Sequence, residues 1–153
     1  MIEILSLRDR FIGGNGVGRV HVDFEIINND DLVLERLGKL KPNQVRRLKT
    51  TGLVDPGATR LVVPQVLARQ LGLKATGQVT VRYADERRAE RDTVDGVAIE
   101  VAGRRGVYSA VVEPRRRMVL LGAIVLEDLD LLVDCKNERI IPRDPHHQIY
   151  EIE

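Results

Sequence analysis

One carboxylate in the chain stands where a side chain could do chemistry. Asp55 follows a short apolar run that ends at Val54, it opens the turn sequence Asp55-Pro56-Gly57, and the apolar run 61–63 comes shortly afterwards. An aspartate at a strand end, in a turn that contains glycine, is exposed on a rigid base. A carboxylate held in this way can take part in acid–base chemistry. From these residues alone, Asp55 is either an ordinary turn aspartate before a proline or a candidate catalytic carboxylate.

The segment after this turn is predicted to be a strand followed by a short helix. Residues 61–63 are β-type sequence, and Pro64 suits the first residue of a helix, where a backbone N–H is not needed. The apolar residues of 67–71 lie on one helical face, and Gly72 is placed to end the helix.

A second apolar segment lies far along the chain. Residues 118–121 form a continuous apolar run, which is typical of a central strand buried on both faces. Gly122 ends this run, and residues 123–129 suit a short helix. We expect this strand and helix to belong to the core of the domain.

Much of the remaining chain alternates between apolar and polar residues, as half-buried strands do. Further strands are expected near 20–26, 79–83, 94–101, 107–112, 131–133 and 139–141, while 32–49 is interpreted as a connection with one helical turn. Seven or more short strands with two short helices predict an all-β, barrel-like fold. No low-complexity linker interrupts the chain, so residues 1–153 are expected to form a single domain.

The residues that flank Asp55 resemble the retropepsin-like aspartic peptidases (clan AA). The signature of that family is two apolar residues, then D-[ST]-G-A, then a short strand. Residues 61–73 look like the segment after the catalytic loop in the prokaryotic branch of the family. Residues 120–134 look like its second hallmark, an apolar strand, a glycine and a short helix, and 139–142 resemble its closing strand.

This resemblance covers the core of the chain, from about residue 18 to about residue 145. It implies a retropepsin-like acid-protease barrel with one lobe per protomer. It also implies that Asp55 is catalytic and that Pro56, Gly57 and Ala58 complete the active-site loop.

The chemistry that the resemblance implies needs two carboxylates. Two such groups about 3 Å apart cannot both ionise, so they share one proton and activate a water that attacks a peptide bond. The chain offers one loop of this kind, and the second carboxylate is therefore expected to be Asp55 of another copy in a homodimer. Peptides or proteins are the expected substrates, and no metal or cofactor is required.

Pro56 departs from the family pattern, which has Thr or Ser at this position. The hydroxyl of that residue forms a hydrogen-bonded link with the partner chain's loop, and proline has neither a hydroxyl nor an N–H. The alternative function is therefore a catalytically impaired or inactive module that keeps the fold in order to dimerise or to bind peptides.

A hairpin that closes over the substrate is the other element that the family implies. Tyr83, Ala84 and Asp85 align with the start of such a flap, and they are candidates for substrate contact. Glu86 stands where a glycine is common in the prokaryotic branch.

Composition argues against other classes of partner. The formal net charge is +1 and aromatic residues make up only 3%, so neither an electrostatic nor a stacking surface for nucleic acid is expected. A small barrel that binds nucleic acid is accordingly the least favoured alternative. No stretch is apolar over the roughly 18 residues of a membrane span. The single Cys135 and an N-terminus without a signal-peptide pattern favour a cytoplasmic setting.

Three further patterns could carry chemistry but have simpler interpretations. The glycine-rich residues 13–18 precede a strand rather than opening a helix, which favours a turn over a phosphate-binding loop. His146 and His147 lack the further ligands that a metal needs, and 115–117 are three arginines in a solvent loop.

Overall fold

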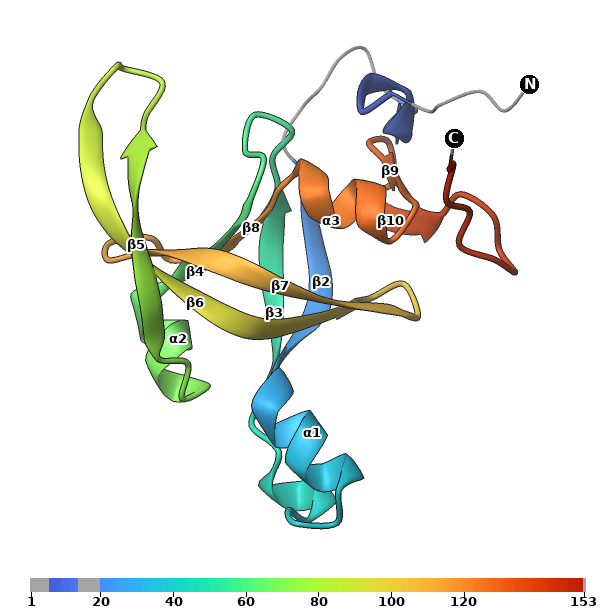
Figure 1. The fold of residues 1–153 in the computed structure, drawn as a ribbon. Helices are drawn as coiled ribbons and strands as arrows, with labels where there is room; N and C mark the ends of the chain where they lie inside the picture. Colours follow the sequence, from blue (N-terminus) through green and yellow to red (C-terminus); the bar gives the residue numbers. More distant parts are fainter. Residues whose placement is uncertain (1–5, 14–19, 153) are drawn as a thin grey trace.

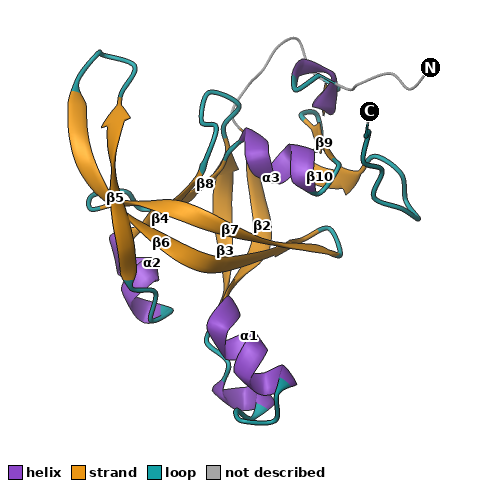
Figure 2. Ribbon diagram, in the orientation of Figure 1, coloured by secondary structure: helices purple, strands orange, loops and turns teal. Residues whose placement is uncertain are grey.

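Strands dominate the computed structural model, which describes residues 6–13 and 20–152 (Figures 1 and 2). The strands are β1 (Phe11–Ile12), β2 (Val20–Asn28), β3 (Arg47–Val54), β4 (Leu61–Pro64), β5 (Ala75–Arg82), β6 (Arg88–Val101), β7 (Arg104–Glu113), β8 (Val119–Leu121), β9 (Leu131–Asp134) and β10 (Arg139–Pro142). The helices are α1 (Asn29–Arg36), α2 (Gln65–Gln70) and α3 (Ala123–Asp128), with short 3₁₀ turns at Arg8–Arg10 and Pro42–Gln44. The glycine-rich turn expected at 13–18 lies, apart from Gly13, outside the described residues, as do residues 1–5.

Seven strands form the main sheet in the order β2-β3-β8-β4-β7-β6-β5. The first strand of this order also pairs with the sixth, because Glu25–Asn28 of β2 lie against Val97–Glu100 of β6. Only these four residue pairs join the two strands. The mainly β fold that the sequence predicts is confirmed, but the expected barrel is a strongly curled sheet rather than a closed barrel.

The strand β8 lies between β3 and β4 in the middle of this sheet. It runs parallel to β3, with Val54 opposite Leu121, and antiparallel to β4, with Val62 opposite Leu120. All three β8 residues are buried. The apolar run 118–121 was expected to form a central strand buried on both faces, and that prediction is confirmed.

The core is built from aliphatic side chains that alternate along the strands. In β2, Val20, Val22, Phe24 and Ile26 are buried while His21 and Asp23 are exposed. The ring of Phe24 covers Gly52 of β3, where an added Cβ would lie 2.5 Å from a ring carbon. A larger residue at position 52 would therefore displace this ring, which belongs to the main core cluster.

The helix α1 occupies the start of the connection expected at 32–49 and makes three α-helices instead of two. Its residues are mostly polar or charged, and its three apolar residues are consecutive, so they lack the apolar period that marks a helix packed on a core. Its start is nevertheless encoded, because the side chain of Asn28 accepts a hydrogen bond from the N–H of Asp31 and caps the helix. The predicted helices at 64–71 and 123–129 are present as α2 and α3.

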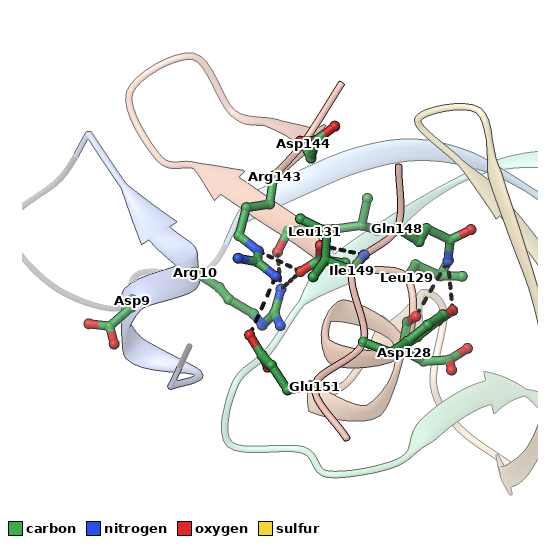
Figure 3. A network of polar contacts seen from close by, with 12 residues as sticks. Asp9, Arg10, Asp128, Leu129, Leu131, Arg143, Asp144, Gln148, Ile149 and Glu151 are labelled. Carbon is green, nitrogen blue, oxygen red and sulfur yellow. Dashed lines mark hydrogen bonds and ion pairs between the residues drawn. The ribbon is translucent and has the colours of Figure 1, made fainter. Parts of the chain in front are cut away.

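A smaller sheet, in the order β1-β9-β10, holds the two ends of the described chain together. Asp130, just before β9, is fully buried and accepts hydrogen bonds from Arg10, Arg143 and the N–H of Ile149. Figure 3 shows the side chains of Arg10 and Arg143 converging in this network. Burial acts to raise the pKa of Asp130, but the hydrogen bonds from Arg143 and Arg10 outweigh it and lower the pKa.

No helix in the part of the chain that the structure describes is both long enough and apolar enough to cross a membrane.

Candidate active site

The Asp55 carboxylate is fixed by backbone groups of its own turn. Asp55 is half-buried where β3 ends, and its N–H donates to the carbonyl of Leu121 in β8 at 3.2 Å. The carbonyl of Asp55 accepts from the N–H of Ala58 at 3.1 Å, which closes a β-turn over residues 55–58. Within that turn the N–H of Gly57 donates to Oδ1 of Asp55 at 2.9 Å. One carboxylate oxygen is thus held by a backbone donor, and the side chain has a defined direction.

The second hallmark of the sequence lies directly against this turn. The N–H of Ala123, at the start of α3, donates to the carbonyl of Ala58 at 2.8 Å, and the N–H of Ile124 donates to the carbonyl of Thr59 at 3.1 Å. Gly122 is buried against the same loop, and an added Cβ would lie 2.6 Å from the Ala58 carbonyl and even nearer that of Arg60. The structure therefore brings residues 55–60 and 122–124 together, although more than 60 residues separate them in sequence.

Pro56 occupies the second position of the turn that Asp55 opens. Proline is favoured there because its fixed φ matches the turn and the position needs no N–H donor. The hydrogen bond to the carboxylate comes from Gly57 instead. Pro56 is therefore compatible with the turn and stiffens it, although it supplies no hydroxyl to a neighbouring chain.

The expected flap is the β5–β6 hairpin, which rises beside the rest of the molecule in Figure 1. Its tip is Tyr83–Arg87, closed by hydrogen bonds from the N–H of Tyr83 to the Arg87 carbonyl and from the N–H of Glu86 to the Tyr83 carbonyl. Glu86 has φ of +68°, a left-handed conformation that glycine adopts more easily. The positive φ at this position explains why the family commonly has a glycine there.

The tip is shorter than the sequence indicates. Residues 84–91 are charged and polar, which suggests a loop, yet β6 already begins at Arg88. Most of β5 is exposed, so the stem of the hairpin needs no apolar side chains. Polar composition therefore does not separate strand from loop in this part of the chain.

The three candidate flap residues differ in their surroundings. The hydroxyl of Tyr83 donates to Oε1 of Glu113 at 2.7 Å, and the guanidinium of Arg87 lies 4.8 Å from the centre of its ring. Burial, followed by the hydrogen bond to Glu113, raises the pKa of Tyr83 above its ordinary value. Ala84 and Asp85 are exposed at the tip, and the N–H of Arg87, bonded to the Asp85 carboxylate, lowers the pKa of Asp85. Substrate contact by these three residues stays a prediction.

Glu113 is a member of this region that sequence reasoning missed. It accepts hydrogen bonds from both Tyr83 and Arg91, which lie 30 and 22 residues away. Its position before Pro114 carries no sequence signal, because the contact depends on how the hairpin folds onto the end of β7. The contact with Arg91 is an ion pair that joins the hairpin to β7.

One comparison with known proteins agrees with the fold. The model of the family described as gag-polyprotein putative aspartyl protease matches residues 43–128, which is more than half of the chain. The chain therefore belongs to this family of retropepsin-like aspartyl proteases. The matched region extends from the 3₁₀ turn before β3 to the end of α3, and it contains the turn at 55–58 and residues 120–128 of the second hallmark. None of the curated proteins matches the chain.

Proposed function

We propose that the chain is an aspartic endopeptidase in which the Asp55 carboxylates of two copies activate a water between them. The observation that carries this proposal is the turn at residues 55–58, where the Leu121 carbonyl of β8 holds the backbone of half-buried Asp55 and the N–H of Gly57 holds its carboxylate. Membership of an aspartyl protease family supports the same reaction class.

The mechanism follows from the chemistry of paired carboxylates. Two such groups about 3 Å apart share one proton, because ionising both would place like charges together. The ionised carboxylate takes a proton from the water as its oxygen attacks the peptide carbonyl carbon, and the protonated carboxyl donates to the carbonyl oxygen. The pair titrates as a unit. No metal or organic cofactor is needed for this reaction.

A homodimer is part of the proposal because each chain supplies one carboxylate. Within the described residues, the N–H of Gly57 is the hydrogen-bond partner of the Asp55 side chain, and no second acidic side chain is bonded to it. A twofold axis through the contact would place two identical turns face to face. In this arrangement each chain would be a single folded unit with one lobe of the site.

The direct test is the variant Asp55→Asn, which removes the ionisable group and keeps the shape of the side chain. We expect it to abolish peptide cleavage, by a factor of about 10³ or more, while circular dichroism and melting stay close to the parent. Asp30→Asn, on an exposed carboxylate of α1, is the matched control and should cleave normally. Normal cleavage by Asp55→Asn would overturn the proposal.

The competing function is a peptide-binding or dimerisation module with impaired catalysis. It is favoured by Pro56, which supplies no hydroxyl at the position where the family has Thr or Ser. Pro56→Thr distinguishes the two functions. A gain in cleavage of about tenfold or more would show that the natural chain is impaired, because a lost hydroxyl contact costs on the order of 1 kcal/mol or more. An unchanged or lower rate favours the active peptidase.

The proposed setting is the cytoplasm, and the proposed substrates are extended segments of peptides or proteins. A single cysteine suits a reducing compartment. An assignment to the prokaryotic branch of the family is likewise part of the proposal.

A further inference from the structure

Three polar side chains join the flap hairpin to the end of β7. Oε1 of Glu113 accepts from the Tyr83 hydroxyl at 2.7 Å and from Nε of Arg91 at 3.0 Å. Nε of Arg91 also lies 3.1 Å from the Tyr83 hydroxyl oxygen, so the three groups form a closed triangle. Because the acceptor is charged, these hydrogen bonds belong to the stronger kind.

This triangle is better protected from water than the other ion pairs of the hairpin. The side chains of Arg91 and Glu113 are 25% and 16% exposed. Those of the Arg82–Glu86 and Arg87–Asp85 pairs are all more than 60% exposed. Exposed ion pairs contribute little to stability, so among these ion pairs the Glu113 triangle is the one expected to stabilise the hairpin.

The part of the hairpin that carries Tyr83 and Arg91 has little other support. The pairing of β6 with β7 begins at Thr93, opposite Val111, and residues from Arg88 to Asp92 pair with β5 alone. Most of β5 is exposed, including Val79 at 38%, so it contributes no residue to the buried core. A two-stranded hairpin without a packed face is only marginally ordered. The angle of the hairpin to the sheet therefore depends on the triangle.

The aromatic ring of Tyr83 strengthens the same contact. The guanidinium groups of Arg87 and Arg91 lie 4.8 and 5.9 Å from its centre, which is within the range of cation–π attraction. Tyr83 is thus bound at its ring by its own hairpin and at its hydroxyl by Glu113 of β7.

We propose that Glu113 is a positioning residue that fixes the flap hairpin through Tyr83 and Arg91 and so sets the affinity for the peptide substrate. This role rests on the proposed function. The effect of Glu113 on catalysis is expected to be confined to substrate binding. Releasing the hairpin lowers the population that can close on a peptide, which raises KM, while the carboxylates that perform the chemistry are unchanged.

The experiment compares Glu113→Ala, Tyr83→Phe and the double variant with the parent chain. Tyr83→Phe keeps the ring and removes only the hydroxyl. Glu100→Ala is the matched control, because it removes a carboxylate paired with Arg105 at the other end of β6. Amide hydrogen exchange of residues 75–93 is measured by mass spectrometry, and KM and kcat are measured with one peptide substrate.

We expect exchange in the hairpin to become about three- to tenfold faster in both single variants and unchanged in Glu100→Ala. KM should rise by a similar factor of about three to ten, with kcat altered less than about twofold. The double variant should resemble Glu113→Ala, because the two side chains act through one contact.

Unchanged hairpin exchange in Tyr83→Phe and Glu113→Ala would overturn the role of Glu113, as would a fall in kcat at constant KM. Hydrogen exchange needs no catalysis. If the parent chain cleaves no peptide, the proposed function fails, while faster exchange in the variants still supports the positioning of the hairpin by Glu113.

Discussion

Asp134, at the end of β9, shows how a single carboxylate can make the fold sensitive to acid. It accepts hydrogen bonds from the side chain and N–H of Asn137 and from Nε of Arg139. The Asn137 side chain has the largest effect on its pKa, burial opposes it, and Arg139 adds to it, so the pKa falls to about 2. A carboxylate with a lowered pKa stabilises the fold when it is ionised.

The sign of this effect predicts a pH dependence. Stability from Asp134 should be fully present above the unfolded pKa of about 4 and lost as the pH falls toward 2. Asp134→Asn should therefore melt well below the parent at pH 6, and this difference should shrink at pH 2.5. Melting curves of both proteins across this range check it. An equal difference at both pH values would contradict the role of the ionised carboxylate.

The residues found from sequence and those missed differ in the range of their contacts. Asp55 could be proposed from the sequence because its signal is local: an apolar run, a turn and a glycine within a few positions. Its turn and its Gly57 hydrogen bond are also local. Glu113 contacts residues 22 and 30 positions away, and such a contact appears only once the hairpin is folded. Sequence patterns therefore locate the candidate carboxylate but not Glu113, which joins the β5–β6 hairpin to β7.

At the scale of elements, the junction between β8 and α3 determines the shape of the Asp55 loop. The first two N–H groups of α3 donate to the carbonyls of Ala58 and Thr59. They can do so only because Gly122 has no side chain, since an added Cβ would lie 2.6 Å from the carbonyl oxygen of Ala58. The loop and the helix start are thus packed backbone against backbone.

This packing predicts the result of Gly122→Ala. The added methyl must push the loop away from α3, which should cost about 1–3 kcal/mol in the free energy of unfolding and also lower peptide cleavage. Urea denaturation measures the first effect. Gly77→Ala in β5 is the control, because its Cβ would meet only the Thr93 hydroxyl, at 3.2 Å. If Gly122→Ala and the parent are equally stable, the loop accommodates the methyl group at no cost and the prediction is wrong.

Helices and strands could be predicted from the sequence where their burial requires apolar residues at regular spacing. The strand at 118–121 and the helix after Pro64 are apolar in the pattern that their surroundings require. The helix α1 and the stem of the hairpin are not, because α1 buries only Asp31 and most of β5 is exposed, so either polar loops or regular structure would fit their residues. The incomplete closure of the sheet could not be predicted either, since it depends on how many residues of β2 pair with β6.

At the scale of the whole molecule, Asp130 joins segments from both ends of the described chain. Arg10 and Arg143 both bond to it, and the side chains of Arg10 and Asp130 are 6% and 0% exposed. Asp130→Ala should destabilise the fold by about 3–5 kcal/mol, because it leaves a buried guanidinium without its counter-charge. Urea denaturation checks this, with Glu100→Ala as the exposed-pair control. A loss as small as that of the control would show that Arg10 finds another partner.

The proposed dimer makes a quantitative prediction for mixtures of active and inactive chains. When equal amounts of the parent and Asp55→Asn are unfolded and refolded together, about one quarter of the dimers should carry two Asp55 carboxylates. Since a dimer with one carboxylate lacks the pair that shares a proton, cleavage per parent chain should fall to about half. Asp30→Asn in place of Asp55→Asn should cause no loss. A site completed within one chain would keep its full activity per parent chain in both mixtures, and that result would exclude a dyad shared between copies.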